Sequence, residues 1–139
     1  MYSCETRTNT NPAIEKLTFE GQDVDLAKGI TLDRCTAVKR MDCPEPKLDV
    51  RVSDGSWEEN PSEVVDGRVL REQIWASLYS DKRDLEVEAR LLFDTTKGRP
   101  AKTEVKFKAA AEPGTGTIWV FVHDNRGGAA WLVVPVTVK

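Results

Sequence analysis

Two strand-like runs separated by a short turn, at residues 117–139, constrain the fold of this chain more than any other feature. The runs at 117–123 and 129–139 are rich in β-branched and aromatic residues. The intervening residues, 124–128, include an Asn and two Gly. This composition is typical of a β-hairpin, so the sequence predicts two paired antiparallel strands here.

Alternation within the two runs predicts which side chains face the core, because successive strand residues point to opposite faces. We expect the inner face to carry Ile118, Val120, Val122, Leu132, Val134, Val136 and Val138. With a turn at 125–127, Phe121 should lie near Trp131 on the outer face as a cross-strand aromatic pair. Pro135 cannot donate to a ladder, so we expect it at an edge or a bulge, where its missing N–H faces no partner.

Length and composition favour one globular domain at residues 13–139, preceded by a flexible N-terminal tether at residues 1–12. Charged residues make up 31% of the chain and hydrophobic residues 40%, an ordinary globular mixture. The net charge of −3 gives no electrostatic basis for binding nucleic acid or an anionic membrane. No apolar run approaches the ~20 residues that a membrane-spanning helix needs. The first four residues hold no hydrophobic segment, so we expect no signal peptide in this chain. An exported chain of this kind would be a processed or truncated form of a longer precursor.

The close spacing of Cys35 and Cys43 predicts a disulfide bond, with Cys4 left over. In the chain-entropy model, closing this short loop stabilises the fold by about 2.5 kcal/mol. A disulfide would place the protein in an oxidising compartment. The alternative is two unpaired structural thiols in a cytosolic protein. A zinc site is not favoured, because no third or fourth ligand accompanies the pair.

Cys4 has a more specific interpretation as a lipidation site. It follows a small residue, Ser3, and precedes a polar tract at residues 5–12, as at the mature start of a bacterial lipoprotein. A lipid on Cys4 would anchor the domain to a membrane without spanning it. The alternative is a cysteine with no role near a disordered terminus.

Shorter alternating runs predict the remaining strands, at 13–20, near Ile30, and at 47–52, 72–79, 85–93 and 103–108. In the run at 85–93 we expect Phe93 to point inward and Leu92 outward. Residues 57–67 hold Asn-Pro and Asp-Gly pairs, which indicate a loop or a loose hairpin. With the final hairpin the count is about seven strands, which favours an all-β, antiparallel, immunoglobulin-like β-sandwich.

Residues 69–79 allow two interpretations. Leu70, Ile74 and Leu78 are four residues apart, as on one face of a helix. As a strand, Ile74, Ala76 and Leu78 would face one way. Because the rest of the chain is strand and turn, and because this run has a strand-like composition, we predict a strand at 72–79.

The C-terminal hairpin resembles the last two strands of PKD-like and other immunoglobulin-like domains, which are common in bacterial cell-surface lipoproteins. The similarity lies in Gly-Thr-Ile-Trp-Val-Phe-Val-His-Asp-Asn-Arg-Gly-Gly-Ala-Ala-Trp and the closing Val-Pro-Val-Thr-Val. Residues 48–55 and 74–79 resemble the second and third strands of such domains. The acidic loop at 57–67 and the cysteine loop depart from a minimal domain. The resemblance implies adhesion, scaffolding or partner contact, and it carries over no catalytic residues.

Aromatic residues provide the clearest candidates for a binding surface: Trp57, Trp75, Tyr79, Trp119, Phe121 and Trp131. Several fall on the outward rows of predicted strands. If exposed together, they would mark a partner or ligand surface. The alternative is that the acidic loop or the N-terminal segment covers them.

Three functions follow from these residues. The first is a non-catalytic module of the bacterial cell envelope, in the periplasm or at the outer-membrane surface, that binds another protein. The second is a carbohydrate-binding module in which Trp75, Tyr79, Trp119 and Trp131 stack on sugar rings. The third, and least favoured, is a hydrolase that uses His123 and Asp124.

No cofactor or metal is predicted. Several carboxylates could meet at one end of a sandwich and hold Ca²⁺, which needs several oxygen ligands: Asp54, Glu58, Glu59, Asp66, Asp94 and Asp124. No loop shows EF-hand spacing, so solvated carboxylates in turns are the favoured interpretation.

Overall fold

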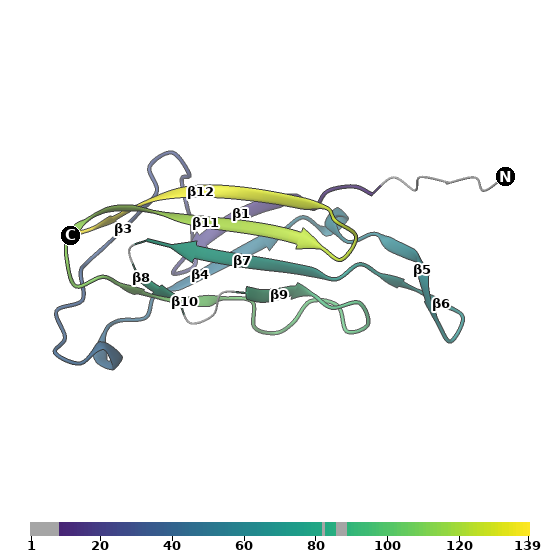
Figure 1. Cartoon of the computed structure of the whole chain (residues 1–139), viewed down its shortest axis with the longest axis horizontal. Coiled ribbons are helices and arrows are strands. Elements are labelled where there is room, and N and C mark those ends of the chain that lie inside the picture. The colour runs from purple at the N-terminus through teal and green to yellow at the C-terminus, as the bar shows by residue number, and fades with distance from the viewer. Residues whose placement is uncertain (1–8, 82, 86–88) are drawn as a thin grey trace.

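The chain folds almost entirely into β-structure, as the sequence predicts. A computed structural model describes residues 9–81, 83–85 and 89–139. The strands of this described part form two five-stranded sheets and one two-stranded hairpin (Figure 1). The all-β prediction is confirmed, but short additional strands raise the number above the predicted seven: twelve are present in the described residues.

The first sheet has the order β2-β1-β4-β10-β8. Its members are β1 (Ile14–Phe19), β2 (Gln22–Asp23), β4 (Lys47–Val52), β8 (Arg83–Leu85) and β10 (Val105–Ala109). The predicted strand at 47–52 is confirmed, and its inward row of Leu48, Val50 and Val52 is buried. The alternation that predicted these strands therefore also predicts their buried face.

The second sheet has the order β3-β12-β11-β7-β9. Its members are β3 (Ile30–Leu32), β7 (Ile74–Ser80), β9 (Ala89–Phe93), β11 (Gly114–Asp124) and β12 (Ala129–Val138). The C-terminal hairpin is confirmed, and Phe121 pairs directly with Trp131 as predicted.

The expectation of a purely antiparallel fold is wrong at one edge of the second sheet. β3 runs parallel to the end of β12, with Ile30 opposite Val136. The chain reaches this edge from β2 of the first sheet, so it crosses between the sheets just before β3, and no hairpin joins β3 to β12. The pairing continues beyond the strands, where the Arg34 amide donates a 2.8 Å hydrogen bond to the carbonyl of Lys139.

The predicted strand at 85–93 is wrong in two respects. β8 pairs with β10 in the first sheet, whereas β9 pairs with β7 in the second, and residues 86–88 lie outside the described residues. The ladder between β7 and β9 also shifts between Ile74 and Trp75, which leaves one extra residue on β9. This bulge turns both Leu92 and Phe93 inward, although Leu92 was expected to face solvent.

Strand structure at 74–80 is confirmed, and the helical alternative is wrong. Ile74, Ala76 and Leu78 are buried on one face of β7. The segment before it forms a hairpin of β5 (Glu59–Val65) and β6 (Arg68–Arg71), the loose hairpin that was one of the two expectations for this region.

Side chains from both five-stranded sheets meet in one hydrophobic core. The largest fully buried side chains are Phe107, Leu17 and Leu48 from the first sheet and Ile74, Leu78 and Ile118 from the second. Complete burial of a leucine or phenylalanine side chain contributes about 1.5–3 kcal/mol, so this contact between the sheets dominates the stability of the fold. Within the described residues the helical segments are two short 3₁₀ turns, η1 (Arg40–Asp42) and η2 (Asp54–Ser56), and no helix there is long and apolar enough to cross a membrane.

Candidate interaction surface

The outer face of the second sheet gathers aromatic side chains from three neighbouring strands. The register places Trp119 between Tyr79 on β7 and Val133 on β12, and Phe121 between Ser77 and Trp131. Because alternate residues of a strand share a face, these side chains all point away from the core. We call this surface the aromatic face and define it as Trp75, Tyr79, Trp119, Phe121, Trp131 and Val133.

Much of the aromatic face is open to solvent. Trp131 is 65% exposed, Val133 53%, Tyr79 49% and Phe121 40%, while Trp75 and Trp119 are half-buried. Among the described residues, neither the β5–β6 hairpin nor residues 9–12 cover these side chains, although such cover was the alternative interpretation of the sequence.

Contacts between the rings hold part of the aromatic face in place. Tyr79 and Phe121 meet edge to face, with ring centroids 6.2 Å apart. Trp75 stacks on His123 at 5.4 Å. Both pairs bridge β7 and β11, which are inner strands of the sheet, so the face is built on a rigid support.

Trp57 is the one predicted aromatic that lies elsewhere. It stacks on Phe93, with centroids 4.2 Å apart and planes within 9° of parallel. The Arg99 guanidinium lies over the Trp57 ring, 4.8 Å from its centroid. Trp57 therefore packs against the core instead of joining the aromatic face.

His123 and Asp124 point to opposite faces of β11, because they are adjacent strand residues. The His123 ring stacks on Trp75 on the outer face, whereas Asp124 is buried. The Asp124 carboxylate accepts hydrogen bonds from the Arg126 amide at 2.8 Å, the Gly128 amide at 2.7 Å and the Asn9 side chain at 2.9 Å. These bonds engage the carboxylate in shaping the hairpin turn, so it is not placed to orient His123 for catalysis.

A polar cluster surrounds the same turn, and sequence reasoning did not find it. The Glu72 side chain is completely buried and accepts a 2.8 Å hydrogen bond from Arg126. Burial raises the pKa of the Glu72 carboxyl above its ordinary value, and hydrogen bonds from the Glu58 amide and Arg126 oppose that rise. A glutamate at the start of a predicted strand gives no signal that it will be buried, because its partner is distant in the sequence.

The last residues of the predicted tether contact this cluster. The Thr10 amide donates to Glu58, and Asn11 accepts from the Ala129 amide at 3.3 Å. The hydrogen bonds from Thr10 lower the pKa of the Glu58 carboxyl, and the positive charge of Arg126 adds to that effect. Residues 9–11 thus lie against the turn of the C-terminal hairpin.

The acidic residues considered for Ca²⁺ are dispersed among other contacts. Asp54 forms an ion pair with Arg99. Asp94 accepts hydrogen bonds from the amides of Lys97 and Thr96, which lower the pKa of its carboxyl. Across residues 9–81, 83–85 and 89–139, no group of three or more His, Cys, Asp or Glu side chains is arranged to hold a metal ion.

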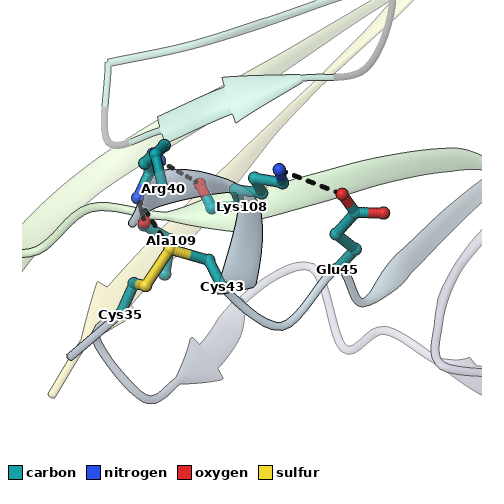
Figure 2. The surroundings of a disulfide bond; sticks show 6 residues. All are labelled: Cys35, Arg40, Cys43, Glu45, Lys108 and Ala109. Carbon is teal, nitrogen blue, oxygen red and sulfur yellow. Dashed lines mark hydrogen bonds and ion pairs between the residues drawn. A yellow bond between two sulfur atoms is a disulfide. The ribbon is translucent and has the colours of Figure 1, made fainter. Parts of the chain in front are cut away.

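The predicted disulfide between Cys35 and Cys43 is present, and both residues are buried (Figure 2). The loop that it closes is fixed to β10 through Arg40, which donates to the carbonyls of Lys108, at 3.2 Å, and Ala109. Glu45, just beyond the loop, pairs with Lys108 at 3.0 Å and Lys106 at 2.9 Å, and these contacts lower the pKa of its carboxyl. Cys4, the predicted lipidation site, lies outside the described residues.

No protein-family model matches the chain, and no curated protein matches it either. The geometry of the aromatic face and the disulfide are therefore the basis on which a function can be proposed.

Proposed function

We propose that this chain is a non-catalytic, immunoglobulin-like module of the bacterial cell envelope that binds a protein partner through its aromatic face. The observation that carries this proposal is the set of exposed apolar side chains, Tyr79, Phe121, Trp131 and Val133, which are contiguous on one sheet. Large contiguous apolar patches are rare on monomers and mark interaction sites. Trp and Tyr in particular are enriched among residues that dominate binding energy.

The strand order supports the immunoglobulin-like assignment. An immunoglobulin constant-type sandwich has strands A, B, E and D in one sheet and C, F and G in the other. The series β1-β4-β10-β8 has the order A-B-E-D, and β7-β11-β12 has the order C-F-G. β2, β3, β9 and the β5–β6 hairpin are additions to this pattern.

The chemistry of the aromatic face favours a protein over a polysaccharide. Phe121 and Val133 have no hydrogen-bonding group, and Val133 is more exposed than either Tyr79 or Phe121. A sugar site needs polar groups that converge around its stacking rings, whereas a protein interface has an apolar centre. The aromatic face, with its exposed apolar side chains, is closer in composition to a protein interface.

The disulfide supports an extracytoplasmic location, because such bonds persist in oxidising compartments. Assignment to the envelope further depends on Cys4. Intact-mass measurement of protein from its native cells tests this point. We expect acyl chains on Cys4 and the loss of two hydrogen atoms at Cys35 and Cys43; an unmodified Cys4 would remove the lipid anchor from the proposal.

Photo-crosslinking in the native cells tests the binding function. A photoreactive amino acid at position 131 should yield a specific protein adduct, and the same probe at Met41, which is 73% exposed on the disulfide loop, should not. Truncation of Phe121 to Ala should weaken the adduct at position 131. The absence of a specific protein adduct at position 131 would contradict the proposal. Binding of the purified chain to a glycan array, without any protein adduct, would favour the carbohydrate-binding alternative.

A further inference from the structure

β12 is paired unequally on its two sides. On one side it pairs with β11 along its whole length, Ala129–Val138. On the other it pairs with β3 only at Val136, Thr137 and Val138. Among the described residues, no strand pairs with residues 129–134 on that side. We propose that an extended segment of the protein partner adds to this free edge as a further strand of the second sheet.

The inference rests on the proposed function for the existence of a protein partner, and it specifies how that partner binds. Addition of a strand to an open sheet edge is a recurring mode of peptide recognition, in which main-chain hydrogen bonds supply affinity and alternate side chains supply specificity. The free edge of β12 borders the aromatic face, so one segment would contact both.

The hydrogen bonds of the hairpin identify the free backbone groups. The Asp124 amide donates to the carbonyl of Gly128, and the next amide along, that of Ala129, donates outward to Asn11. Antiparallel pairs alternate between bonded and non-bonded, so every second residue after Ala129 also directs its amide and carbonyl away from β11. Trp131 and Val133 therefore offer two N–H and two C=O groups to an incoming strand.

Pro135 and Gly29 set one end of this edge. By the same alternation, an N–H at position 135 would point away from β11, and Pro135 has none to donate. The sequence predicted that Pro135 would lie where a missing N–H faces no partner. The backbone of Gly29 lies so close to the carbonyl of Pro135 that a Cβ on Gly29 would clash with it. The β3 segment thus reaches the edge at Pro135 and leaves the edge beside Trp131 and Val133 open.

The other sheet edges carry the protection that this one lacks. Natural proteins block edge strands by making them short, charged or bulged. β2 has two residues and includes Asp23, β8 has only three residues, and β9 holds Arg90 and a bulge. Residues 129–134, Ala-Ala-Trp-Leu-Val-Val, hold no charge, and their register with β11 has no bulge.

The free edge fits an extended peptide segment better than a second copy of the chain. Two residues with free backbone groups give a short seam, whereas a stable dimer buries at least about 1,200 Å². A peptide segment can pair with this seam and also lay its alternate side chains beside Trp131 and Val133, which are the two most exposed members of the aromatic face. The partner segment should therefore be extended, with apolar residues at alternate positions.

The test uses the full chain and a phage-displayed library of short linear peptides with Val, Ile, Phe or Trp at alternate positions. Selected peptides are titrated against the parent chain, Val133→Pro and the matched control Val133→Ala. Val133→Pro removes an outward N–H without removing a bond to β11, whereas Val133→Ala keeps the N–H and removes only side-chain contacts. We expect Val133→Pro to weaken binding at least about tenfold relative to Val133→Ala.

Two further readouts keep the result independent of folding. Bound peptide should slow hydrogen exchange of the Trp131 and Val133 amides, measured by NMR, and Val133→Lys, which charges the edge, should also weaken binding. The proposal is overturned if no peptide is selected, if neither amide is protected, or if the Pro and Lys variants bind as the parent does. A self-associated parent that Val133→Pro makes monomeric would assign the edge to a second copy and would also overturn it. Crosslinking at position 131 that depends on Phe121 but is unaffected by Val133→Pro would leave the proposed function standing without strand addition.

Discussion

The guanidinium group of Arg126 donates a 2.8 Å hydrogen bond to the carboxylate of Glu72, whose side chain is completely buried. This bond ties the turn between β11 and β12 to the segment that precedes β7. The same carboxylate accepts a 3.2 Å hydrogen bond from the Glu58 amide. Three segments distant in the sequence therefore meet at one buried acid, at the end of the molecule where the C-terminal hairpin turns.

Arg126→Met should destabilise the fold, because it leaves the buried Glu72 carboxylate without its cationic partner. Removal of one member of a buried ion pair costs about 3 kcal/mol, and we expect a loss of that order in the free energy of unfolding at pH 7, measured with urea. Arg68→Met, on the exposed β6 strand, is the matched control and should change the free energy of unfolding by less than about 0.5 kcal/mol. Equal effects of the two substitutions would show that the Arg126–Glu72 pair is not important for stability.

The same variant should acquire a distinct pH dependence. Burial already raises the folded-state pKa of Glu72 above its ordinary value of 4.5, and loss of Arg126 removes one influence that opposes the rise. A raised carboxyl pKa means that the folded state holds a proton which the unfolded state has released. The free energy of unfolding of Arg126→Met should therefore fall, relative to that of the parent, as the pH rises from the unfolded-state pKa of Glu72 through its folded-state pKa. Urea unfolding at pH 4.5, 5.5 and 7 measures how the free energy of unfolding changes with pH. The same pH dependence in Arg126→Met and the parent would contradict the prediction.

Gly128→Ala should destabilise the hairpin turn. A Cβ at this position would clash with the Asp124 carboxylate and would also crowd the Asn9 side chain. The Asp124 carboxylate accepts hydrogen bonds from the Gly128 amide and from the Asn9 side chain, so displacement of either group costs a bond, and we expect a cost of about 1–3 kcal/mol. Gly55→Ala is the control, because a Cβ there meets open space. Thermal unfolding of the two variants compares them, and a Gly128→Ala protein as stable as Gly55→Ala would contradict the packing described for the turn.

The hairpin and the core rows could be predicted from the sequence because they depend on local alternation. Phe121 and Trp131 are paired through a turn of a few residues, so their register follows from the turn itself. The buried charge of Glu72 could not be predicted, since Arg126 lies 54 residues away. The inward orientation of the Leu92 side chain could likewise not be predicted, because a bulge in β9 breaks the two-residue alternation from which the orientation was inferred.

Removal of the disulfide should weaken the fold by a moderate amount. Cys43 comes eight positions after Cys35, and closure of so short a loop contributes about 2.5 kcal/mol in the chain-entropy model. Cys35→Ser with Cys43→Ser should therefore lower the urea midpoint, and the parent under reducing conditions should match the double variant. The Arg40 contacts with β10 would be loosened in both. An unchanged midpoint in the double variant would show that these contacts hold the loop in place without the covalent bond.

Trp57 and Trp131 should respond oppositely to truncation, because the structure separates the core-packed ring from the exposed one. Trp57→Ala removes the stacked contact with Phe93 and exposes part of the core, so we expect a loss of about 3 kcal/mol in the free energy of unfolding. Trp131→Ala removes a side chain that is 65% exposed and lies opposite Phe121 in the ladder, so the loss should be less than about 1 kcal/mol. Partner binding should show the reverse order under conditions where both variants are folded, with the larger loss in Trp131→Ala. If Trp131→Ala proved the more destabilising of the two, the aromatic face would be a structural surface, and its exposure would no longer support a binding role.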